Sequence, residues 1–147
     1  MPNHWISTCN PKRWDIWGFL DDGNSLSDIE NWSVSRYFVD MAEDEDAVLW
    51  VAGEKRGVYA VGIIAGVPHD GTGGEYWVDE HDGARRRDYI PLGRHTDVSE
   101  RPLLAEELKV DPRFADATVI TFPRAGNLHR LDDRQWQAMR ELGGHRV

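Results

Sequence analysis

Apolar residues recur along this chain in short runs with the spacing of β-strands. Alternation at residues 5–9 predicts a strand that Asn10-Pro11 ends. Residues 47–51 predict a second strand, and the almost uninterrupted apolar run at 58–67 predicts a central strand. Two further strands are expected at residues 87–92 and 117–122.

Helical patterns cover residues 11–20, 35–41 and 101–108, and a last helix that Asp132 or Asp133 caps. In this last helix Trp136, Met139 and Leu142 share one face, as expected of a helix that packs on a core. The Gly-, Asp- and His-rich stretch at 68–82 is expected to be a loop, and residues 53–57 and 123–127 to be turns.

This mixture predicts one α+β domain over residues 1–147, with a small barrel-like sheet of mixed strands flanked by short helices. A chain of 147 residues is long enough to bury most of its apolar surface without disulfides. The pattern contains no repeat, linker or low-complexity segment.

The net charge of −9 argues against strong, indiscriminate binding to a phosphate backbone. The charge is uneven, because residues 1–82 hold 5 basic and 16 acidic residues (net −11), whereas residues 83–147 hold 12 and 10 (net +2). Of the 17 basic residues 14 are arginine, which suits bidentate phosphate contact and stacking. Any contact with a backbone is therefore expected to be local.

Cys9 is the only cysteine, which excludes an intrachain disulfide and a cysteine metal cage. The six histidines lack the spacing of zinc ligands, so we expect no metal and no cofactor. The N-terminal residues lack a secretion signal, and no apolar run approaches the roughly 20 residues of a membrane span. The sequence thus predicts a soluble, cytoplasmic protein without membrane contact.

Several tryptophans stand in polar surroundings, which points to a ligand site. Trp32 begins the segment Trp32-Ser33-Val34-Ser35-Arg36-Tyr37, and Trp14 and Trp17 lie in Asn10-Pro11-Lys12-Arg13-Trp14-Asp15-Ile16-Trp17. Tryptophan among such neighbours is typical of a pocket wall that stacks a flat ligand, and nucleobases are commonly recognised in this way.

The order of several segments also resembles a known family. These are Asn10-Pro11 before Trp14-Asp15-Ile16; the segment at Trp32; Val48-Leu49-Trp50-Val51; Gly57-Val58-Tyr59-Ala60-Val61-Gly62; Leu103-Leu104-Ala105-Glu106-Glu107-Leu108-Lys109 with Asp111-Pro112; and Arg124-Ala125-Gly126-Asn127 before Leu131-Asp132-Asp133-Arg134-Gln135-Trp136. Together they resemble the EVE domain, a member of the PUA-like superfamily related to the YTH readers of methylated adenine. The resemblance implies a PUA-like pseudo-barrel with an aromatic pocket for a modified cytosine or methylated adenine in DNA or RNA. It also implies a setting in restriction, defence or RNA modification sensing, with a partner nuclease.

The resemblance and the residue types together suggest a set of site residues. Trp32 is the expected wall of the pocket, Trp77 the second wall, and either Trp14 or Trp17 a further one; the alternative for each is packing in the core or on the barrel. Asn10 is expected to bond a base edge, since an amide both donates and accepts, with Ser33 and the backbone of Val34 beside it. The residues expected near flanking phosphates are Arg36, Arg124, Asn127 and, within the cluster at 85–87, Arg86. Three other tryptophans are assigned to the core: Trp5, Trp50 and Trp136.

Two other functions stay open at this point. Related ASCH-type proteins include small amidohydrolases of modified nucleosides, and Thr8 and Lys12 lie near the expected pocket. A protein-interaction module is the third alternative, because the acidic half offers a charged surface. A binding protein is nevertheless favoured over an enzyme, since no third catalytic residue accompanies Thr8 and Lys12.

Overall fold

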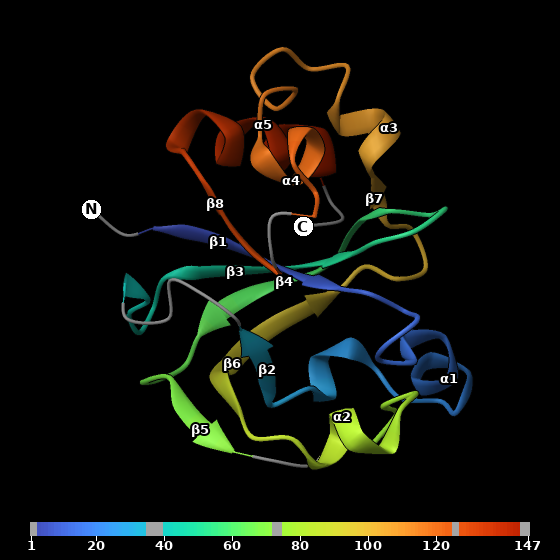
Figure 1. Ribbon diagram of the computed structural model, residues 1–147. Coiled ribbons are helices and arrows are strands. Elements are labelled where there is room, and N and C mark those ends of the chain that lie inside the picture. Colours follow the sequence, from blue (N-terminus) through green and yellow to red (C-terminus); the bar gives the residue numbers. More distant parts are fainter. Residues whose placement is uncertain (1–2, 35–39, 72–74, 125–126, 145–147) are drawn as a thin grey trace.

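The computed structural model describes residues 3–34, 40–71, 75–124 and 127–144 (Figure 1). Its elements in chain order are β1 (His4–Cys9), α1 (Ile16–Asp21), the 3-10 helix η1 (Leu26–Asp28), β2 (Asn31–Val34), β3 (Asp46–Val51), β4 (Gly57–Ile64), β5 (His69–Gly71), α2 (Glu80–Ala84), β6 (Arg87–Asp97), β7 (Leu103–Leu104), α3 (Ala105–Leu108), α4 (Thr118–Thr121), β8 (Leu128–Leu131) and α5 (Asp133–Gly143). The predicted α+β class is confirmed.

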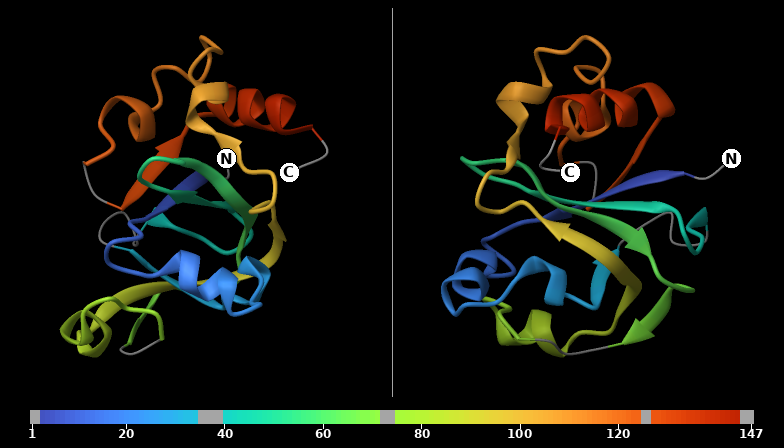
Figure 2. Two further views of the ribbon diagram at one scale, coloured as in Figure 1. Left: turned by 90° about the vertical axis from the view of Figure 1, so that its right-hand side faces the viewer. Right: turned by 180° about the vertical axis from the view of Figure 1, so that it is seen from behind.

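The strands form one mixed sheet in the order β2-β6-β4-β3-β1-β8, with β5 added beside β6 and β7 beside β4. β1 and β3 run parallel, with Trp5 opposite Ala47, whereas the other named pairs are antiparallel. The sheet curls into a half-barrel, as Figure 2 shows. The run at 58–67 does become the central strand β4, which ends at Ile64.

Two apolar cores pack against the two faces of this sheet. Successive side chains of β3 point to opposite faces of the sheet. Ala47, Leu49 and Val51 therefore enter the first core, and Val48 and Trp50 enter the second. The first core is closed by α1, η1 and β2. The second is closed by α3, α4 and α5, which lie together on one side of the sheet with α1 on the other (Figure 2).

Local hydrogen bonds place the start of the first helix later in the chain than predicted. Residues 11–13 form a turn, because the carbonyl of Asn10 accepts from the backbone N–H groups of Arg13 and Trp14 at 2.9 and 3.0 Å. The helix begins only at Ile16, where Asp15 accepts from the N–H of Gly18 at 3.0 Å and caps it. It ends at Asp21, next to the predicted stop.

Other boundaries also differ from expectation. The expected loop at 68–82 contains β5 and the start of α2, and β6 continues to Asp97. The helix expected at 101–108 is divided into β7 and α3. Of the helix expected at 35–41, residues 35–39 lie outside the described part of the chain.

The prediction of a strand at 117–122 is wrong. Residues 118–121 are β-branched and favour a strand locally, but they form the short helix α4, which buries Val119 in the second core. The position beside β1 is taken instead by β8, whose Leu128 and Leu131 are buried. Tertiary packing therefore overrides local propensity here.

Within the described ranges, no helix combines the length and the apolar composition that a membrane crossing requires.

Candidate functional site

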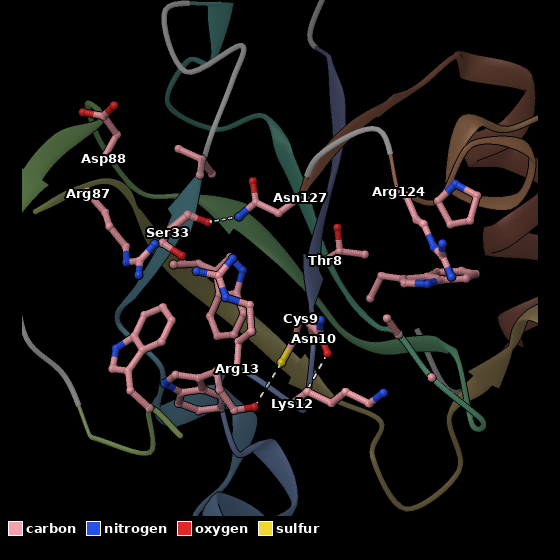
Figure 3. Close-up of a pocket in the computed structure, with 18 of the residues that line it drawn as sticks. Thr8, Cys9, Asn10, Lys12, Arg13, Ser33, Arg87, Asp88, Arg124 and Asn127 are labelled. Carbon is pink, nitrogen blue, oxygen red and sulfur yellow. Dashed lines mark hydrogen bonds between the residues drawn. The ribbon is translucent and has the colours of Figure 1, made fainter. Parts of the chain in front are cut away.

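A cavity of about 930 Å³ opens at the carboxyl end of β1 (Figure 3). Its described lining residues come from seven parts of the chain: Thr8, Cys9, Asn10, Lys12, Arg13 and Trp14; Trp32, Ser33 and Val34; Trp50, Ala52 and Gly53; Arg56; Trp77; Arg85, Arg86, Arg87 and Asp88; and Pro123, Arg124 and Asn127. The volume falls in the range of about 300–1,000 Å³ that small-molecule sites occupy.

Backbone hydrogen bonds bring these distant segments together. The carbonyl of Cys9 accepts from the N–H of Ala52 at 2.8 Å, and the N–H of Thr8 donates to the carbonyl of Asn127 at 2.7 Å. The end of β1 thus lies between the turn that follows β3 and the segment that precedes β8. On the other side, the N–H of Val78 donates to the carbonyl of Arg13 at 2.8 Å, which places Trp77 next to Trp14.

Trp32 forms part of both the first core and the cavity wall. It lies on β2 opposite Ile90, and only 7% of its surface is exposed. The ring of Trp14 packs edge-on against it, with centroids 5.3 Å apart and planes at 76°. No residue of the described chain accepts a hydrogen bond from the Trp32 indole N–H, an unusual state for a buried donor.

Trp77 is half-buried and held from two directions. The guanidinium of Arg87 lies 4.4 Å from its ring centroid, a cation–π distance. A methyl group built on Gly83 would lie 3.3 Å from its Cδ1, so the ring packs closely on α2. Trp77 therefore lines the cavity and also anchors α2.

Some polar groups of the cavity lining already form hydrogen bonds within the chain. Oδ1 of Asn10 accepts from the backbone N–H of Lys12 at 3.0 Å, which leaves its NH₂ group available to a ligand. The carbonyl of Ser33 accepts from Nδ2 of Asn127 at 2.9 Å (Figure 3). The hydroxyl of Thr8 has no partner within the part of the chain that the structure describes. Burial raises the pKa of the Cys9 thiol to about 12.

Seven of the described lining residues are basic and one, Asp88, is acidic, although the chain as a whole carries −9. Arg86 pairs with Asp70 at 2.6 Å, and Arg13 and Arg87 both pair with Asp82 at 3.2 Å. These arginines lower the pKa of both carboxyls: the hydrogen bond from Arg86 acts chiefly on Asp70, and that from Arg13 on Asp82.

The cavity brings together nine of the eleven residues proposed from the sequence. These are Asn10, Trp14, Trp32, Ser33, Val34, Trp77, Arg86, Arg124 and Asn127. Trp17 does not line the cavity: it is 39% exposed and packs its ring against Tyr59 at 5.7 Å. Arg36 lies outside the described residues.

Sequence reasoning missed several lining residues, of which Arg56 is the clearest. Nothing in its turn sequence suggests a site, because only the pairing of β1 with β3 brings this turn to the cavity.

Trp50 is buried at 1% exposure, as expected, but also lines the cavity. Trp5 is fully buried in the core, and Trp136 is half-buried with its ring stacked on His4 at 4.7 Å.

No group of three or more His, Cys, Asp or Glu residues in the described ranges could hold a metal ion.

Neither a protein-family model nor a curated protein matches this chain. Solved structures do match over nearly the whole length. Human THYN1 in complex with 5-methylcytosine-containing DNA is 13% identical, with 99% of each chain covered and a TM-score of 0.60. The DUF55 domain of human thymocyte nuclear protein 1 is 13% identical, with 97% of this chain and 99% of that chain covered and a TM-score of 0.61. A protein of Agrobacterium tumefaciens is 15% identical, with 96% and 93% covered and a TM-score of 0.62.

These similarities establish the fold. The curled sheet and short helices match the PUA-like fold of the human neighbours, as the sequence predicts.

Proposed function

We propose that this chain is an EVE-type module that binds a modified nucleobase in DNA or RNA. The main support is the cavity itself, which combines Trp14, Trp32 and Trp77 with seven basic residues in an acidic protein. The similarity in fold to a human protein solved with 5-methylcytosine-containing DNA also favours this function.

Selective binding of a modified base requires both stacking on aromatic rings and a close fit of the base to the cavity. Taking a base out of its stack costs a few kcal/mol, and stacking on an aromatic side chain returns about 1–3 kcal/mol per base. A methyl group that fills an apolar niche adds roughly 0.8 kcal/mol, which alone gives only about fourfold discrimination. Preference for a modified base therefore depends on the shape of the aromatic wall.

The proposed roles follow from the contacts. Trp32 and Trp77 are the walls, and Trp14 braces Trp32 from its edge. The guanidinium of Arg87 lies 4.4 Å from the ring centroid of Trp77 and fixes this side of the proposed base site. The NH₂ group of Asn10 donates to an acceptor on the base edge, with the backbone of Ser33 and Val34 beside it.

The test is a binding screen with single-stranded and duplex oligonucleotides that carry one methylated or hydroxymethylated cytosine or one methylated adenine, in DNA and RNA. We expect at least one modified oligonucleotide to bind more tightly than its plain twin and to quench tryptophan fluorescence. If plain and modified oligonucleotides bind alike throughout, the proposal is wrong.

Trp32→Phe, rather than Trp32→Ala, tests the wall, because truncation of so buried a tryptophan costs about 3–5 kcal/mol of stability. The smaller ring and the loss of the N–H are expected to weaken binding of the modified oligonucleotide about tenfold. Trp17→Phe is the matched control, since Trp17 lies outside the cavity, and should bind like wild type. Equal affinities for the two variants would remove Trp32 from the site.

One observation supports the hydrolase alternative: Thr8 and Lys12 line the same cavity, and the Thr8 hydroxyl lacks a partner in the described chain. Asp88 is the single carboxylate among the described lining residues. If the chain is an amidohydrolase, chromatography will show turnover of modified nucleosides that Lys12→Ala stops. Binding without turnover favours the proposed module that binds a modified nucleobase.

A further inference from the structure

The basic residues of the cavity differ in whether their charge is already neutralised. Arg13, Arg86 and Arg87 are held in ion pairs, whereas Lys12, Arg56, Arg85 and Arg124 form no salt bridge with the described part of the chain. A cation that is already paired gains less from a phosphate, because the phosphate must approach the partner carboxylate as well.

Three of the unpaired cations lie on segments that meet at the carboxyl end of β1. Lys12 follows β1, Arg56 lies in the turn after β3, and Arg124 precedes β8. The hydrogen bonds from Ala52 to Cys9 and from Thr8 to Asn127 hold these three segments side by side. We refer to Lys12, Arg56 and Arg124 as the cationic rim. Figure 3 shows Arg124 on one side of Thr8, and Arg87 and Asp88 on the other.

The two sides of the cavity differ in their ion pairs rather than in the number of cations. On the far side Arg13, Arg86 and Arg87 are paired with Asp70 or Asp82, and Asp88 also lines the cavity there. The three rim cations have no carboxylate beside them among the described lining residues.

Arg56 also acts on the carboxylate of Glu106. This carboxylate is paired with Lys109 at 2.6 Å, and this hydrogen bond is the main cause of its lowered pKa, with Arg56 a smaller one. Lys109, rather than Arg56, thus forms the salt bridge with Glu106.

We propose that the cationic rim binds the backbone phosphates of the nucleic acid on the side where the strand enters the cavity, and that Arg86 binds none. This inference rests on the proposed function, because it assigns the path of the strand at that same site. It departs from the sequence-based expectation, which placed Arg86 among the phosphate contacts.

The test uses the dependence of affinity on salt concentration. Each phosphate contact to a single strand releases counterions and contributes about 0.7 to the slope of log Kd against log salt concentration. The probe is a fluorescein-labelled single-stranded DNA with one central 5-methylcytosine, together with its plain twin, titrated by anisotropy over a range of KCl concentrations.

We expect Lys12→Gln, Arg56→Gln and Arg124→Gln each to lower the slope by about 0.7. A variant that binds like wild type at 1 M salt would then bind about fivefold more weakly than wild type at 0.1 M salt. Arg124→Lys should restore the slope, because it restores the charge. Arg86→Gln is the matched control: it removes the same charge from the same cavity, and its slope should equal that of wild type.

Two results would overturn the proposal. One is an unchanged slope in the three rim variants with an unchanged circular dichroism spectrum. The other is a loss of slope in Arg86→Gln as large as theirs. The ratio of affinities for the modified and plain probes reports separately on base recognition, so the rim and the base pocket can fail independently.

Discussion

At the scale of single residues, Trp32 shows why a pocket residue and a core residue need not be alternatives. Its ring packs with Trp14 in the first core, yet it also forms the wall of the cavity. Its indole N–H has no acceptor within the described ranges, and leaving a buried donor unpaired costs about 1–3 kcal/mol. Such a cost at a cavity wall agrees with the binding role proposed for Trp32.

Cys9 is expected to be unreactive in the folded protein. Its thiol is 1% exposed and burial raises its pKa to about 12, so at pH 8 almost none of it is thiolate. We expect a colorimetric disulfide reagent to leave native protein unlabelled at pH 8 and to label one thiol per chain in urea. Rapid labelling of the native protein would contradict the buried position of Cys9.

At the scale of elements, short segments are stabilised by caps and by tertiary contacts rather than by length. In α5 the carboxylate of Asp132 accepts from the N–H of Gln135 at 2.7 Å, and Gln135 Oε1 accepts from the N–H of Asp132 at 2.9 Å. This capping box fixes the start of the helix that places Ala138 and Met139 in the second core.

Asp132→Ala should therefore lower the free energy of unfolding by about 1 kcal/mol. Urea denaturation followed by circular dichroism measures this, with Gln137→Ala as the control because Gln137 is exposed on the same helix. The control should change stability by less than about 0.5 kcal/mol. Oligonucleotide binding should be the same in both variants, since α5 lies outside the cavity lining.

At the scale of the whole molecule, the buried carboxylate of Glu45 and the half-buried carboxylate of Asp97 join segments that are distant in sequence. Glu45 accepts hydrogen bonds from the indole of Trp5 at 3.0 Å and from the backbone N–H groups of Asn3 and Ala42 at 2.6 and 2.7 Å. Burial by itself would raise the pKa of Glu45, but these hydrogen bonds outweigh it and the pKa is lowered. In Asp97 burial likewise opposes hydrogen bonds from Ser99, Leu26 and Ser25, and the pKa is again lowered.

A lowered pKa in the folded state stabilises the protein above the unfolded pKa, near 4.3 for glutamate, and that stabilisation is lost as pH falls through the folded value. We expect wild type to be more stable than Glu45→Gln at pH 7, and the difference to shrink below about pH 4.5. Urea midpoints for both proteins between pH 3 and pH 7 measure this, and the comparison isolates Glu45 because both share every other titrating group. A difference that stays constant with pH would contradict the role assigned to its charge.

The sequence by itself determined the strands at β1, β3 and β4 and the capped helix α5, because their apolar patterns and caps are local signals. It also pointed to Trp14, Trp32 and Trp77, three of the four tryptophans among the described lining residues, through their polar neighbours and the family resemblance. It did not find β8 or the helix α4, where short segments with weak or misleading propensities take their structure from the partners they pack against.

Only the tertiary structure decided which charges are available at the cavity. Arg86 looks like a phosphate contact in sequence, but Asp70, sixteen residues away, neutralises it across two strands. Arg56 and Arg124 lie far apart in the chain and line the same cavity because β3 and the segment before β8 adjoin the end of β1. Ion pairs and cavity edges depend on distances between segments, and the order of residues along the chain does not encode those distances locally.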